Sequence, residues 1–205
     1  MNGTIATQLY QRFQQFVADD LVKEAQNGSN RAHTEIYGLY SQAVFTLAHG
    51  ICRNPQCAED VLHNTFVKLM KKIKTFKFQA PFGMWLRQIA VNESLMYLRQ
   101  QKKHKLAISS DEFDGFEDLA IENVEPTTRA YVDSAAQHTH QMDLDTVLAA
   151  LPDHVRTILW LKEVEGYTHQ EIADMMGKTP SYSKSVTARA YIFLRARVGQ
   201  AKTLQ

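Results

Sequence analysis

Residues 165–194 have the sequence EGYTHQEIADMMGKTPSYSKSVTARAYIFL, and this stretch decides the fold of the C-terminal part of the chain. Thr168 and Glu171 have the Thr-x-x-Glu spacing of a capping box, in which each side chain bonds the other residue's free backbone N–H. Gly177 follows as a turn residue, because glycine adopts a left-handed backbone at little steric cost. Thr179-Pro180 supplies the N-cap and the first position of a second helix. This order predicts a helix-turn-helix, whose second helix would enter a DNA major groove.

The second helix of this pair is expected to have an inward and an outward face. We expect Ser183, Val186 and Ala190 to face inward. Hydroxyl and cationic groups on an exposed N-terminal turn suit contacts with phosphates and base edges. The residues predicted to contact DNA are Thr179, Ser181, Tyr182, Lys184, Ser185 and Arg189. An ordinary solvated helical hairpin is the alternative; the capping box, the turn glycine and the acid-free basic tail from residue 177 onward favour DNA binding.

Apolar residues follow a helical period in the rest of the chain as well. One helix face is formed by residues at spacings of three and four, namely Ile36, Leu39, Ala43, Val44, Leu47 and Ile51. Asn54-Pro55 ends that helix and begins another, because Asn is a good N-cap and Pro fits the first helical position. A third helix is expected from about Met84 to Lys103. The sequence therefore predicts an all-α protein with two small helical domains.

Charge is distributed in blocks, although the whole chain has a net charge of only +1. Residues 68–105 hold ten Lys or Arg and one acid, whereas residues 111–125 hold seven acids and no base. We expect residues 19–105 and 141–198 to be the two domains, joined by an acidic flexible linker over 106–140. Residues 1–18 are expected to form an N-terminal extension, with an extra helix packed on the first domain. Two basic blocks around an acidic one predict two tethered polyanion-binding surfaces.

The first basic block also contains many aromatic residues. Lysines there alternate with Phe76, Phe78, Phe82, Trp85 and Tyr97. Bases that have left a duplex stack on aromatic rings while cations hold the backbone, so this block is typical of a protein that captures melted strand. The alternative is that the rings are core, and we expect this for Trp85 and for one or two of the phenylalanines.

In this order, the two helical parts resemble an extracytoplasmic-function sigma factor of the sigma-70 family. Residues 19–99 resemble region 2 of the family, and residues 144–198 resemble region 4. The resemblance implies binding to core RNA polymerase through the β′ clamp helices and the β flap. It also implies recognition of promoter DNA at the −10 and −35 elements, help in promoter melting, and control by an anti-sigma protein.

The resemblance further implies roles for single residues. Region 4 would recognise the −35 element through the outward face of its second helix. Core-polymerase binding is expected at Asp60, Asn64 and Phe66. Contacts with the −10 element are expected at Phe76, Phe78, Phe82, Trp85, Arg87, Asn92, Arg99 and Lys102.

A second set of residues has the chemistry of a metal site. His49, Cys52, Cys57 and His63 include two cysteines and two histidines, which makes zinc conceivable. The usual C-x-x-C pair is absent, so we expect no metal and no cofactor. The two cysteines cannot supply a disulfide framework, and we expect them to be small buried hydrophobic residues in a reducing compartment.

Several function classes have no support in the sequence. A P-loop, a nucleophile elbow and a convergent carboxylate pair are all missing, so we expect no catalytic residues and no enzyme. No apolar run of about 18 residues and no signal-peptide pattern occurs, so we expect a cytoplasmic protein without membrane insertion. Two alternatives remain: a signal-responsive helix-turn-helix regulator acting without core polymerase, and a metal enzyme built on the His/Cys set.

Overall fold

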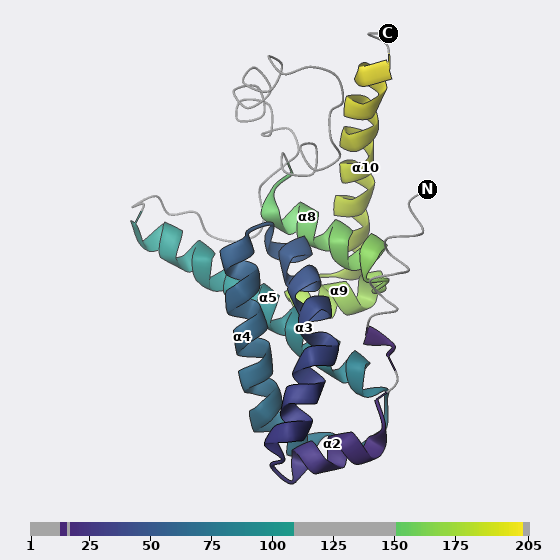
Figure 1. Cartoon of the computed structure of the whole chain (residues 1–205). Coiled ribbons are helices and arrows are strands. Elements are labelled where there is room, and N and C mark those ends of the chain that lie inside the picture. The colour runs from purple at the N-terminus through teal and green to yellow at the C-terminus, as the bar shows by residue number, and fades with distance from the viewer. Residues whose placement is uncertain (1–12, 16, 109–150, 203–205) are drawn as a thin grey trace.

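The computed structural model describes residues 13–15, 17–108 and 151–202, and every regular element in these ranges is a helix (Figure 1). The predicted all-α fold is thereby confirmed. The helices form two groups, which we call the first module (residues 13–108) and the second module (residues 151–202). The acidic segment at 111–125 lies outside the described residues.

The first module is a helical bundle built from four helices and one short 3-10 turn. Its elements are α2 (Asp19–Gln26), α3 (Asn30–Cys52), α4 (Pro55–Lys72), η1 (Ile73–Thr75) and α5 (Phe82–Ile108). Helices α3, α4 and α5 pack side by side, and α2 crosses one end of them (Figure 1).

The turn between α3 and α4 follows the sequence prediction. The Asn54 side chain accepts a hydrogen bond from the backbone N–H of Cys57 at 3.2 Å, and Pro55 is the first residue of α4. Arg53 ends α3 with a left-handed backbone, at a φ of 53°. The expected face of α3 is buried, except that Leu39 is half-buried.

Helix α5 is longer at both ends than the expected helix from Met84 to Lys103. It begins at Phe82, because the carbonyl of Pro81 accepts hydrogen bonds from the backbone N–H groups of Met84 and Trp85. It extends to Ile108, because no glycine or proline occurs between Gly83 and Gly115 to interrupt it earlier. Residues 106–108, which we expected in the linker, are therefore helical.

Part of the N-terminal extension belongs to the first module. The Phe13 side chain is buried and lies 6.3 Å from the ring of Tyr40, measured between centroids. The hydroxyl of Tyr40 donates to the carbonyl of Gln15 at 3.1 Å. Gly83 lies so close that a Cβ there would be 1.9 Å from the carbonyl oxygen of Phe13. Residues 13–15 thus pack on the bundle; residues 1–12 lie outside the described residues, so the extra helix expected in the extension stays a prediction.

The second module contains the helix-turn-helix. Its elements are α8 (Asp153–Leu159), the π-helical turn η3 (Trp160–Val164), α9 (His169–Met176) and α10 (Pro180–Lys202). The capping box at Thr168 and Glu171 is present, and Gly177 ends α9 with a φ of 66°. Helix α10 extends well past α8 and α9 (Figure 1).

Candidate nucleic-acid interface

The outward face of α10 has the composition expected of a DNA-reading helix. Its inward residues Ser183, Val186 and Ala190 are buried, as predicted. The outward residues Ser181, Lys184, Ser185 and Arg189 are exposed, and Tyr182 is half-buried. The face therefore presents hydroxyl and cationic groups, which can bond phosphate oxygens and base edges.

Local contacts hold this face in position. The Thr179 hydroxyl accepts from the backbone N–H of Tyr182 at 3.2 Å and so caps α10. The ammonium of Lys178 lies 5.6 Å from the centre of the Tyr182 ring. The guanidinium of Arg189 donates to the Ser185 hydroxyl at 2.8 Å.

A histidine joins the two helices of the helix-turn-helix. The Nδ1 atom of His169 on α9 lies 2.9 Å from the hydroxyl of Ser183 on α10. Desolvation, followed by the nearby charges of Lys162 and Lys184, lowers the pKa of His169. The neutral imidazole is thus favoured beside the basic face of α10.

Four aromatic residues of the first module, Phe76, Phe78, Phe82 and Trp85, form one cluster at the start of α5. The Phe76 ring lies 5.0 Å from that of Phe78, 5.4 Å from that of Phe82 and 5.2 Å from that of Trp85. The side-chain amide of Gln26 fixes the loop, because it donates to the carbonyls of Ile73 and Phe76 at 2.9 and 3.0 Å.

Burial divides this cluster into core and surface residues. Phe76 and Phe82 are buried, which agrees with the expectation that one or two phenylalanines belong to the core. Trp85 is half-buried and packs against the core, although we expected it to be buried. Phe78 is exposed and has a positive φ of 57°, a backbone conformation that is costly for an aromatic residue. Phe78 and Trp85 are therefore the rings with accessible surface for a base.

Most of the lysines near this cluster are exposed. Lys71, Lys72, Lys74 and Lys77 face solvent between α4 and the aromatic loop. Lys68 is different, because it pairs with the buried carboxylate of Glu93 on α5. The basic block thus leaves a cationic surface around the rings, which suits a nucleic-acid backbone.

Arg87 does not face solvent in this structure. Its Nε atom donates to the Glu165 carboxylate at 2.8 Å, its Nη2 atom donates to the Glu165 carbonyl, and both side chains are almost fully buried. The guanidinium carbon also lies 4.2 Å from the centre of the Tyr167 ring. The second oxygen of Glu165 accepts from the indole N–H of Trp160 at 3.2 Å. A residue expected to contact DNA is therefore held by the second module.

The other polar residues of α5 also meet the second module or lie near it. Arg99 donates to the carbonyl of Met175 at 2.7 Å, and the hydroxyl of Tyr167 donates to Gln88 at 3.4 Å. Asn92 is exposed and accepts from the amide of Gln88 at 3.3 Å. The side chain of Lys102 lies outside the described residues.

The C-terminal turn of α3 completes this boundary between the modules. A Cβ atom on Gly50 would lie 2.0 Å from the Trp160 ring, so the indole sits directly on the glycine backbone. We call the whole set the intermodule contact. Its members are Gly50, Arg87, Gln88 and Arg99 of the first module and Trp160, Glu165, Tyr167 and Met175 of the second.

The sequence did not reveal the intermodule contact. Glu165 stands just before a turn glycine and Trp160 lies in an apolar helix, so both match ordinary local patterns. The packing of the Trp160 ring on Gly50 is the one unusual feature of this contact. The sequence does not reveal it, because the two residues are far apart in the chain.

The residues expected to bind core polymerase lie on α4. Asn64 is exposed and Asp60 is half-buried. Phe66 is buried, and the exposed ring of Tyr37 lies 4.7 Å from it. Sequence reasoning did not select Tyr37, which presents the aromatic surface at this place.

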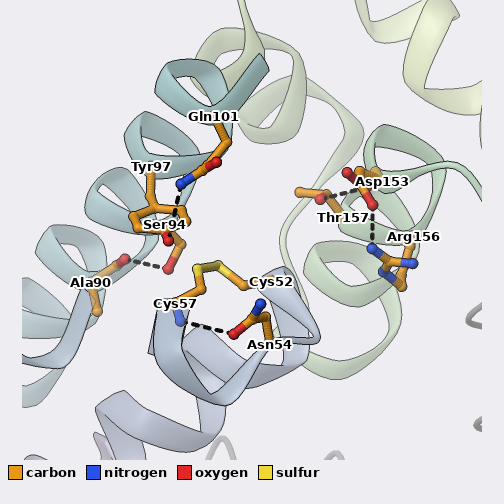
Figure 2. Close-up of a disulfide and its surroundings, with 10 residues drawn as sticks. All are labelled: Cys52, Asn54, Cys57, Ala90, Ser94, Tyr97, Gln101, Asp153, Arg156 and Thr157. Carbon is orange, nitrogen blue, oxygen red and sulfur yellow. Dashed lines mark hydrogen bonds and ion pairs between the residues drawn. A yellow bond between two sulfur atoms is a disulfide. The ribbon is translucent and has the colours of Figure 1, made fainter. Parts of the chain in front are cut away.

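The two cysteines are joined as a disulfide in the structure (Figure 2). They are buried, as expected, but the expectation of two separate thiols is wrong for this structure, because the turn at Arg53 and Asn54 brings them together. Within the described ranges, His, Cys, Asp and Glu residues form no group of three or more suited to a metal ion. His63 is exposed, and the His49 ring stacks on Phe45 at 6.1 Å.

None of the helices in the described part of the chain is both long and apolar enough to span a bilayer.

Comparison with known proteins places both modules in one family. The family model for sigma-70 region 2 matches residues 36–104, and the model for sigma-70 region 4 matches residues 141–194. The RNA polymerase sigma-H factor of Pseudomonas aeruginosa is 29% identical over 189 residues, which is 90% of this chain and 92% of the relative. The ECF RNA polymerase sigma factor SigW of Bacillus subtilis is 23% identical and covers 76% of this chain and 82% of its own.

A solved structure supports the fold. The sigma factor RpoE of Bartonella quintana, crystallised with the anti-sigma factor NepR, matches with a TM-score of 0.50 and 22% identity. The match covers 81% of this chain and 96% of the other. With two region models in the family's order, the chain belongs to the sigma-70 family, as an RNA polymerase sigma factor of the extracytoplasmic-function type that acts in transcription initiation.

Proposed function

We propose that this sigma factor binds core RNA polymerase, recognises promoter DNA at the −35 and −10 elements, and helps to separate the strands. The observation that carries the proposal is that the two modules present different kinds of nucleic-acid-binding surface. The exposed hydroxyl and cationic face of α10 suits intact duplex, and the partly exposed rings beside lysines in the first module suit unpaired bases. The action is binding, with no chemical step on the DNA.

In the second module, Lys184, Ser185 and Arg189 would recognise the −35 element. All three side chains are exposed on the N-terminal half of α10, where a recognition helix contacts base edges. Thr179, Ser181 and Tyr182 lie at the start of the same helix and would fix its register through phosphate contacts.

In the first module, Phe78 and Trp85 would receive bases of the −10 element. Stacking on an aromatic side chain contributes about 1–3 kcal/mol per base, which offsets the unstacking cost of a few kcal/mol per step. The buried rings of Phe76 and Phe82 hold these two rings in place, because Phe76 contacts Phe78 and Phe82 contacts Trp85. Asn92, Arg99 and Lys102 on α5 would contact the same strand.

Promoter recognition requires the modules to separate. Arg87 is buried against Glu165, so its guanidinium is not available to DNA in this arrangement, whereas Arg99 is exposed and donates to the Met175 carbonyl. Two promoter elements separated by a stretch of duplex cannot both be reached while the modules are in contact. We propose that core polymerase stabilises the separated form. It would bind the first module at Asp60, Asn64 and the Tyr37–Phe66 surface, and its β flap would bind the second module. Two linked contacts reinforce each other in such an assembly.

The anti-sigma factor in the Bartonella quintana complex suggests a third partner. We propose that a protein of that class holds this chain in a form with the modules together, where Arg87 stays bound to Glu165.

The decisive experiment is transcription from a genomic promoter library by core polymerase, with and without this protein. We expect defined RNA start sites only when the protein is added, and a footprint that spans both elements only when core polymerase is present. The R189A variant should weaken these starts, and the K23A variant, which removes an exposed lysine on α2, should leave them unchanged. Protection of a DNA site by the protein alone would instead indicate a regulator that acts without polymerase. Absence of any start site would overturn the proposal.

A further inference from the structure

We propose that Cys52 and Cys57 are a reversible thiol–disulfide site whose oxidised state strengthens the intermodule contact. The inference goes beyond promoter recognition and does not depend on it. It rests on the position of the two residues in the fold and on the elements that meet there.

The turn between α3 and α4 brings the two sulfur atoms together. Cys52 is the last residue of α3, Cys57 is the third residue of α4, and their Cα atoms are 6.2 Å apart. This separation lies within the range of about 4.4–6.8 Å found for disulfides. The left-handed backbone of Arg53 and the capping bond from Cys57 to Asn54 fix the turn independently of the sulfurs. The reduced pair would therefore remain close enough to re-form the bond.

The surroundings suit a reaction with a small oxidant. Cys57 lies in the first turn of α4, where the helix dipole favours a negative charge on sulfur. Cys57 is 1% exposed and Cys52 is 9% exposed, so a small peroxide reaches this pair more readily than a protein thiol does.

The reaction balances with a hydroperoxide as the oxidant. One thiolate attacks the peroxide oxygen, and water or an alcohol leaves as a sulfenic acid forms. The second thiol then attacks that sulfur, the S–S bond forms, and water leaves. The two cysteines give up two electrons, and the peroxide accepts them. A dithiol reverses the reaction by thiol–disulfide exchange.

The same turn of α3 supports the second module. Gly50, two residues before Cys52, lies against the Trp160 ring, and α3 is in contact with α8. Figure 2 draws the disulfide between two groups of side chains, with Ser94 and Tyr97 of α5 on one side and Asp153 and Thr157 of α8 on the other. The bond ties the end of α3 to the start of α4. It therefore restrains the backbone on which Trp160 rests.

Thiol titration of the folded protein tests the site. The chain contains two cysteines, so every thiol signal reports this pair. After treatment with dithiol and its removal, we expect two free thiols. After hydrogen peroxide, we expect none, with the loss of two hydrogens in the intact mass and no dimer on a non-reducing gel. C52S and C57S should form a sulfenic acid or a disulfide-linked dimer instead.

Hydrogen exchange measures the effect on the intermodule contact. Amides of α8 and of the last turn of α3 should exchange about tenfold faster in the reduced protein than in the oxidised protein. The C52S/C57S double variant should match the reduced protein and should not respond to peroxide. Amides of α2, at the far end of the bundle, serve as the internal control (Figure 1).

Three results would overturn the inference. The first is that both thiols survive peroxide treatment of the folded protein. The second is that oxidation gives mainly dimers of the wild-type chain. The third is equal exchange of α8 in the oxidised and reduced proteins. Reduced wild type provides the comparison if the double variant fails to fold.

Discussion

At the start of α9, two side chains satisfy each other's backbone groups. The Thr168 hydroxyl accepts from the backbone N–H of Glu171 at 3.2 Å, and the Glu171 carboxylate accepts from the backbone N–H of Thr168 at 2.8 Å. Bonds from the Thr168 backbone and, next, from its hydroxyl lower the pKa of Glu171 below its ordinary value of 4.5. The cap thus couples the stability of the helix-turn-helix to acid pH.

The T168A variant should lower the free energy of unfolding by about 1 kcal/mol, because the cap of α9 is lost. The T168S variant retains the hydroxyl and should remain close to wild type. Because the folded carboxyl has the lower pKa, its contribution is present above pH 4.5 and is lost as pH falls through the lowered value. Urea titrations from pH 7 to pH 3 would measure both effects. A T168A protein as stable as wild type would show that the cap contributes nothing.

Two glycines of α3 provide a matched pair of substitutions. A Cβ on Gly50 would lie 2.0 Å from the Trp160 ring, whereas a Cβ on Gly38 would meet no atom within 4 Å. The G50A variant should therefore push Trp160 away and separate the modules. The G38A variant should stabilise α3 by up to about 1 kcal/mol, since alanine is the better helix former. Small-angle scattering should show a larger radius of gyration for G50A alone; equal radii would contradict the close contact.

At the scale of elements, α10 is the helix whose exposed face should determine duplex binding. The R189A variant removes one exposed cation and should reduce the slope of log affinity against log salt by about 0.9 if it contacts one phosphate. The A190L variant would test packing instead, because Ala190 is fully buried. Binding of holoenzyme to a promoter fragment at several salt concentrations gives the slope. An unchanged slope for R189A would place Arg189 outside the phosphate contacts.

Local chemistry made most elements predictable from the sequence. Asn54-Pro55, the capping box at Thr168 and the turn at Gly177 each have a local physical cause, and each lies where the sequence indicated. The inward and outward faces of α10 also followed from the helical period alone. The ends of α5 were less predictable from the sequence. Its start at Phe82 depends on hydrogen bonds to the carbonyl of Pro81, and no glycine or proline marks its C-terminal end.

Contacts between distant segments explain what the sequence could not predict. Arg87 looked like a cation for DNA, but its partner Glu165 lies 78 positions later in the chain. The sequence of a basic block does not show which of its lysines or arginines will form an ion pair with a distant Asp or Glu. The pairing of Cys52 with Cys57 was also missed, because it depends on the backbone of Arg53 at one tight turn.

At the scale of the whole molecule, the buried pair of Arg87 and Glu165 is the strongest polar link between the modules. The E165A variant leaves the Arg87 charge buried without its partner, and such a change costs about 3–5 kcal/mol. We therefore expect E165A to separate the modules and to increase binding of the free protein to single-stranded promoter DNA.

The double variant R87M/E165L provides the control for this prediction. Two apolar side chains of similar size replace a buried ion pair with little loss, so the modules should remain together. Scattering and single-strand binding should then return toward wild-type values. If E165A remained as compact as wild type, the ion pair would not hold the modules.

The indole of Trp160 gives the molecule a built-in optical reporter. The chain has two tryptophans, and the other one, Trp85, lies within the aromatic cluster of the first module. Once W85F has removed that second emitter, the emission of the remaining indole depends on whether its ring still rests on Gly50. If the Trp160 ring leaves Gly50 and becomes exposed to water, its emission should shift to longer wavelength. Comparing the emission of the unlabelled W85F protein after dithiol and after peroxide would therefore show in which state Trp160 stays on Gly50.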